Sequence, residues 1–203
     1  KKKVKFTEVF SKNANVNRLS AARLFLFGAR DVWFVVGIPI YFYSVLSDGS
    51  EAGNRAAFFA IGSFMAALII GYGVIQGFAP KILRAREKSV ADAVRLARFW
   101  VGVLLVIPAV LAVLVWVSGS APAAWLTGVL VAGLLVFGGV FALNSSLHSY
   151  LILAFTQAER VTMDVGFYYM SNAAGRLVGT LLSGLSYQIG GLPACLACAA
   201  LMV

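Results

Sequence analysis

The feature that most constrains this chain is a succession of apolar runs, each about as long as a membrane is thick. Crossing a hydrocarbon core of about 30 Å takes about 20 helical residues. Hydrophobic residues make up 61% of the 203 positions and charged residues only 12%, about half the charged share of soluble domains. We therefore expect an all-α membrane protein embedded in a lipid bilayer. The predicted spans are residues 19–46, 55–79, 99–117, 124–155 and 165–189, with a partial sixth at 192–203.

Basic residues gather in alternate connecting segments. Six Lys or Arg lie in residues 1–18 and six in 81–98, and Arg160 lies in the next such link, whereas Arg55 stands alone on the opposite side. Basic loops stay in the cytoplasm, so residues 1–18 are predicted to be a cytoplasmic linker and 19–203 a transmembrane bundle. The net charge of +9 follows this membrane pattern, and no nucleic-acid partner is expected.

Three arginines and one aspartate lie within the predicted spans. Arg30 and Arg176 each lie eleven residues past the start of their span, about 16 Å into the membrane. An arginine there costs at least about 2.5–3.5 kcal/mol, so it should face a partner or a water-filled cavity. Asp31 either neutralises one of them as a structural pair or belongs to a binding site. One carboxylate leaves the other guanidinium uncompensated, so we expect a cavity that binds a multiply charged anion.

Weaker signals surround these charges. Arg23 shares a helix face with Arg30 and is predicted either to join the site or to extend to the membrane interface. Asn172, one turn before Arg176, is predicted to orient it or only to contact a helix. A polar cluster in the fourth span is expected either to line a pathway or to bond neighbouring helices, with a proton relay as a further alternative for its histidine; the cluster includes Asn144, Ser145 and His148.

Small residues recur every four positions on two spans, which predicts close helix packing at Gly175, Gly179 and Ser183 and at Gly73 and Gly77. Pro80 is predicted to end the second span. Cys195 and Cys198 are interpreted as small buried residues, since no third ligand is near. No catalytic set, metal site or cofactor is predicted.

Three blocks of sequence carry a family resemblance: residues 17–36 (NRLSAARLFLFGARDVWFVV), 71–80 (GYGVIQGFAP) and 165–185 (VGFYYMSNAAGRLVGTLLSGL). They resemble the carboxy-terminal half of the ArsJ family of organoarsenical efflux permeases, which belong to the major facilitator superfamily. The resemblance implies a six-helix half, helices seven to twelve with the last truncated. The chain starts on three lysines and stops within an apolar run, so we expect an amino-terminal half of the same protein as its partner.

The resemblance further implies export of 1-arseno-3-phosphoglycerate, a small anionic substrate, across a bacterial inner membrane, and hence arsenate resistance. No enzymatic activity is expected, because the polar groups within the spans form no acid–base set. An organophosphate or carboxylate permease with no arsenic role is the closest alternative. A non-transport membrane subunit is the other.

Overall fold

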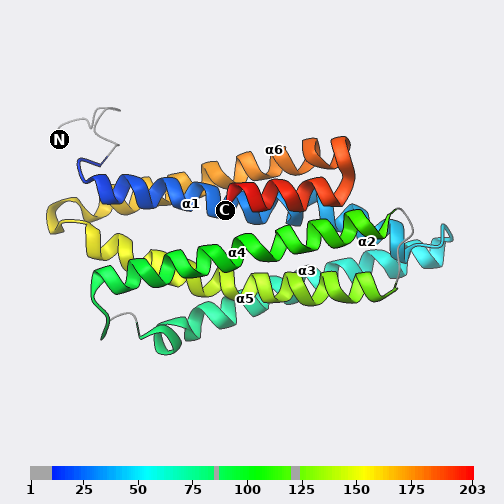
Figure 1. The fold of residues 1–203 in the computed structure, drawn as a ribbon, viewed down its shortest axis with the longest axis horizontal. Coiled ribbons are helices and arrows are strands. Elements are labelled where there is room, and N and C mark those ends of the chain that lie inside the picture. Colours follow the sequence, from blue (N-terminus) through cyan, green and yellow to red (C-terminus); the bar gives the residue numbers. More distant parts are fainter. Residues whose placement is uncertain (1–10, 85–86, 120–123) are drawn as a thin grey trace.

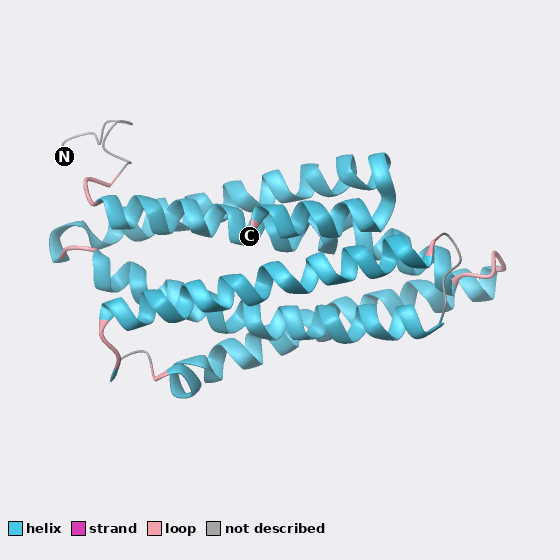
Figure 2. Cartoon of the chain, in the orientation of Figure 1, coloured by secondary structure: helices cyan, strands magenta, loops and turns pink. Residues whose placement is uncertain are grey.

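In the computed structural model, residues 11–84, 87–119 and 124–203 are described, and within them the chain forms helices and no strand (Figure 2). Three helices make up the middle of the chain: α3 (Glu51–Leu83), α4 (Val90–Ser118) and α5 (Ala124–Phe155). The first span combines α1 (Ala14–Val32), the π-helix η2 (Trp33–Gly37) and α2 (Ile38–Leu46). A short 3-10 turn, η4 (Ala158–Arg160), leads into α6 (Val161–Met202).

Five of these helical units in the described part of the chain are long and apolar enough to cross a membrane. The last of them, α6, is two helices joined by a sharp turn. Gly190 and Gly191 leave the helical conformation, and Gly191 has φ +64°, a region that glycine adopts without strain. Figure 1 shows the second arm, residues 192–202, running back along the bundle. The predicted break between the fifth span and the partial sixth is thus confirmed.

The helices run up and down, so connections alternate between the two ends of the bundle (Figure 1). The start of α1, the α3–α4 connection and the α5–α6 connection lie at one end. The α2–α3 loop and the Gly190–Gly191 turn lie at the other. The described parts of the basic segments thus share one end of the bundle, as the predicted topology requires.

Several predicted boundaries are wrong at that basic end. The predicted loop 81–98 is largely helical, because Lys81 belongs to α3 and α4 already begins at Val90. Ser89 caps α4, its Oγ accepting the Asp92 N–H at 3.1 Å. Both helices therefore extend through charged residues beyond their apolar runs.

Two further boundaries differ from prediction. Pro80 lies inside α3, which ends only at Leu83. Arg84 caps it with a φ of +46°, and the Arg84 N–H bonds to the Pro80 carbonyl at 3.1 Å. The amino-terminal segment is shorter than predicted, since α1 starts at Ala14 with Asn13 as its cap. Residues 1–10, and residues 120–123 between the predicted spans 99–117 and 124–155, lie outside the described residues.

The π-helical turn η2 follows directly after Arg30 and Asp31. Pro39, four residues past Val35, explains its position. A proline ring clashes with the carbonyl four residues earlier and has no N–H to donate to it, and a π-turn lets the chain absorb that misfit within a continuous span.

The tightest contact in the described bundle is between α1 and the first arm of α6. A Cβ added to Gly175 would lie 2.1 Å from the Leu24 carbonyl oxygen, and one added to Gly179 would lie 2.4 Å from that of Gly28. The glycine stripe predicted on the fifth span therefore does bring two backbones together.

The stripe on the second span behaves differently. A Cβ at Gly73 or Gly77 would meet nothing within 4 Å, so the predicted packing there is not made within the described chain. This face of α3 also exposes large apolar side chains, among them Phe78, Val74 and Ile70.

We predict that Gly179→Ala lowers the free energy of unfolding by about 1–3 kcal/mol, since the methyl group would overlap backbone that cannot move aside cheaply. Unfolding by sodium dodecyl sulfate in mixed micelles measures this. Gly73→Ala is the matched control and should be neutral or slightly stabilising, because alanine is the better helix former and the space is open. Equal effects of the two changes would contradict the packing described.

We also predict that the α3–α4 connection faces the cytoplasm. A cysteine at the exposed Lys88, with Cys195 and Cys198 replaced by alanine, should resist impermeant thiol reagents in intact cells. A cysteine at Glu51, at the other end of the bundle, should react. The reverse pattern would invert the topology.

Candidate functional site

The carboxylate of Asp31 joins two helices. Its Oδ1 accepts from Nε and Nη2 of Arg30 at 2.7 and 2.6 Å, and its Oδ2 accepts from Nε of Arg176 at 3.1 Å. Asp31 is almost completely buried, whereas the Arg176 side chain is 59% exposed. Asp31 therefore forms the predicted buried ion pair, but with two arginines, one of α1 and one of α6. Its part in a binding site stays a prediction.

Both arginines line one cavity of about 240 Å³, whose other walls come from η2, α3 and α5. Most of these walls are apolar or aromatic: Trp33, Phe34, Leu68, Ile69, Tyr72, Phe137, Gly138 and Phe141. The guanidinium carbon of Arg30 lies 5.1 Å from the ring centre of Phe27 and 5.4 Å from that of Phe141. Ring faces attract cations, so these aromatic side chains hold Arg30 at the cavity without neutralising it.

The cavity has positive charge and free donors. Two guanidinium groups face one carboxylate, which leaves a net charge of +1 from these three side chains. Each guanidinium has five N–H donors in a planar fork, and Asp31 uses only some of them. An oxyanion in the cavity would be attracted by this positive charge and could accept two parallel N–H bonds from one guanidinium.

Arg23 lies apart from this pair. Its side chain is buried, and its Nη1 donates to Ser145 Oγ at 2.8 Å. Its guanidinium carbon lies 3.9 Å from the ring centre of Phe27 and 4.9 Å from that of Tyr168. The alternative in which Arg23 extends to the membrane interface is wrong, because these contacts direct it into the bundle.

The polar cluster of α5 lies next to Arg23 and does not line the cavity. Asn144, Ser145 and His148 are all buried. Ser145 bonds neighbouring helices, since its Oγ accepts from Arg23 of α1 and from Tyr72 Oη of α3 at 3.1 Å. Both amide atoms of Asn144 and Nδ1 of His148 lack a hydrogen-bond partner among the described residues. A pathway role for these side chains stays a prediction.

Asn172 is half-buried on α6, one turn before Arg176. Its Oδ1 has no partner among the described residues, and no hydrogen bond joins it to Arg176 there. Its orienting role also stays a prediction.

Tyr72 and the aromatic side chains around Arg30 are the members of the site that sequence reasoning missed. Tyr72 lies in the quoted block GYGVIQGFAP and both lines the cavity and bonds Ser145. The sequence did contain a signal for Tyr72, because a polar hydroxyl is unusual within a membrane span and this one stands between two glycines.

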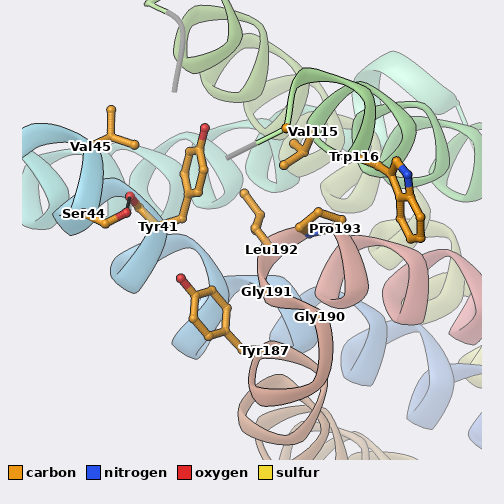
Figure 3. Close-up of a pocket in the computed structure, with 11 residues that line it drawn as sticks. Tyr41, Ser44, Val45, Val115, Trp116, Tyr187, Gly190, Gly191, Leu192 and Pro193 are labelled. Carbon is orange, nitrogen blue, oxygen red and sulfur yellow. Dashed lines mark hydrogen bonds between the residues drawn. The ribbon is translucent and has the colours of Figure 1, made fainter. Parts of the chain in front are cut away.

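A second cavity, of about 590 Å³, lies near the Gly190–Gly191 turn (Figure 3). Tyr41 of α2 and Tyr187 of α6 line one side of it, and Val115 and Trp116 of α4 line the other. No charged side chain lines it, so it offers an anion far less than the arginine cavity does. No group of three metal-ligating side chains is found in the described parts of the chain.

Taken together, the fold defines a multi-pass α-helical membrane protein with a cavity lined by two arginines, one of them mostly exposed. Comparison with models of protein families, with curated protein sequences and with solved structures found no match. The resemblance to the ArsJ permeases and to half of a major facilitator fold therefore stays a prediction.

We predict that Asp31→Asn destabilises the fold by about 2 kcal/mol or more, because it leaves two close guanidinium groups without their common partner. Arg176→Gln should cost less, since Asp31 keeps Arg30 and Arg176 is mostly exposed. The measurement is unfolding in mixed micelles. Asp92→Asn is the control, because its pair with Arg95 is exposed and should be worth no more than about 1 kcal/mol. A neutral Asp31→Asn would contradict a structural role for the shared carboxylate.

Proposed function

We propose that this chain belongs to a transporter that moves a small organic polyanion out of the cell. The observation that carries the proposal is the convergence of Arg30 and Arg176, from two helices, on one cavity with a single carboxylate between them. Charged residues at membrane depth are costly and are kept where an ion or substrate passes. The excess positive charge there favours an anion over a neutral or cationic solute.

The substrate that fits the resemblance is 1-arseno-3-phosphoglycerate. It bears a phosphate group and an arsenate group, and the arginine fork matches the oxygens of either. The arsenic is bound to oxygen, so no thiol ligand is needed. This agrees with the placement of Cys195, which contacts Ser186 at the α6 hairpin and does not line the cavity. Export of this compound would make cells resistant to arsenate.

In this proposal the cavity is completed by the amino-terminal half of the same protein. Two observations support it. Arg176 is 59% exposed although it lies within a span, and an exposed guanidinium in lipid is unfavourable. The adjoining face of α3 carries exposed glycines, Gly73 and Gly77, which allow another helix to approach closely.

We predict that replacing either Arg30 or Arg176 by glutamine in the full-length protein reduces substrate efflux at least tenfold. Glutamine keeps polarity but removes a charge-assisted contact worth about 1.5–3 kcal/mol. Lysine should restore activity only in part, because it keeps the charge and loses the planar fork. The measurement is transport into everted vesicles in which the arsenical is made in place, with membrane abundance followed by immunoblotting.

Arg55→Gln is the matched control, because Arg55 is exposed at the opposite end of the bundle from the basic segments and should leave efflux unchanged. Normal efflux in both glutamine variants would refute the anion site. Equal transport of 3-phosphoglycerate without arsenate would instead favour an organophosphate permease with no arsenic role. Transport of neither compound would favour a non-transport subunit.

A further inference from the structure

Arg23 is a buried charge without a counter-charge. Its side chain is nine-tenths or more buried, and no carboxylate pairs with it among the described residues. One hydrogen bond to Ser145 and two aromatic faces are its contacts, and its Nε has no partner there. An isolated buried guanidinium is strongly unfavourable, and neutral contacts of this kind offset only part of that cost. A bound anion beside the Arg23 guanidinium would supply the missing negative charge.

Other unpaired polar atoms lie beside it. Asn144 and His148 are one turn apart on α5 and so share a face, and Ser20 and Arg23 are similarly placed on α1, which packs against α5. Ser145, which accepts from Arg23, lies next to Asn144 and one turn before His148 on α5. In the other four residues, the buried atoms that have no hydrogen-bond partner in the described part of the chain are Ser20 Oγ, Arg23 Nε, Asn144 Nδ2, Asn144 Oδ1 and His148 Nδ1. Buried polar groups are rarely left unpaired, so several in one layer indicate a ligand or ordered water.

These atoms include both donors and acceptors. Arg23 Nε and Asn144 Nδ2 donate, whereas Asn144 Oδ1 accepts. A halide ion accepts hydrogen bonds but donates none. A singly protonated phosphate group has oxygens that accept and one O–H that donates, so it matches both kinds of atom and supplies the missing negative charge.

A short chain of hydrogen bonds connects this layer to the arginine cavity. Tyr72 lines the cavity, its Oη donates to Ser145 Oγ, and that same oxygen accepts from Arg23. Arg23 lies seven residues before Arg30 on α1, about 10 Å along the helix toward its amino-terminal end. Tyr72 and Ser145 thus lie between two groups of positive charge.

We propose that Arg23, Asn144 and His148 form a second binding site for a phosphate-type oxyanion, placed between α1 and α5 and separated from the arginine cavity by Tyr72 and Ser145. This deepens the proposed function and rests on it for its biological use: the transported polyanion passes from one basic site to the other. The binding itself does not depend on transport.

The test is nuclear magnetic resonance of the protein in lipid nanodiscs with ¹⁵N-labelled arginine, titrated with inorganic phosphate. The Nε–H signal that disappears in the Arg23→Lys variant is assigned to Arg23. The signals of Arg30 and Arg176 are assigned in the same way from Arg30→Lys and Arg176→Lys. We expect phosphate to shift the Arg23 signal, and chloride at equal ionic strength to leave it in place. The exposed Arg55 should not respond in either titration.

A second variant keeps Arg23 as the reporter. Asn144→Ala removes one donor and should raise the phosphate concentration at half-shift about tenfold, as expected for a lost hydrogen bond to a charged group. Thr127→Ala, near the other end of the same helix, should leave that concentration unchanged.

The outcomes separate the two proposals. If Arg30 and Arg176 respond to phosphate and Arg23 does not, the second site is refuted and the cavity stands. If Arg23 responds and the other two do not, the second site stands and the proposed function loses its support. An equal response of Arg23 to chloride would refute the assignment to phosphate-type anions.

Discussion

The shared carboxylate of Asp31 holds together the part of the molecule on which the rest of the account depends. It lies on α1, and its Oδ2 fixes α6 against that helix through Arg176, while its Oδ1 keeps the Arg30 side chain folded back beside it. Each guanidinium repels the other, so without the carboxylate the two would separate. With the carboxylate in place, both guanidinium groups are held at one cavity, and the three side chains together keep a net positive charge.

That arrangement is possible only because α1 and α6 lie unusually close. Gly175 and Gly179 bring the backbone of α6 onto the carbonyls of Leu24 and Gly28, immediately before Arg30 and Asp31. Without these glycines the helices would stand further apart, and Arg176 would not reach Asp31. The π-turn that follows Asp31 sets the direction of the rest of the span around Pro39. Packing, charge and helix geometry therefore act on the same few turns of α1.

Long apolar runs made the helical class, the number of spans and the break near Gly190 predictable, because membrane thickness and glycine conformation leave few alternatives. Pairing of Arg30 with Asp31 was not predictable from helix angles, since adjacent positions point apart and only the length and flexibility of the arginine side chain bring them together. Burial of Arg23 was missed for a related reason: its depth suggested the interface, whereas its contacts with Ser145 and Phe27 depend on neighbouring helices. The ends of α3 and α4 at the basic end of the bundle were misplaced, because charged residues were taken to end a helix and these helices continue through them.

The central claim is that Arg30 and Arg176 together bind the anionic group of a solute. The most direct measurement is the distance between phosphorus and arginine nitrogen by solid-state nuclear magnetic resonance, with 3-phosphoglycerate bound to the labelled protein in lipid. This account predicts dipolar contacts from one phosphate group to side-chain nitrogens of both Arg30 and Arg176. Binding of 3-phosphoglycerate with no phosphorus contact to either arginine would contradict it.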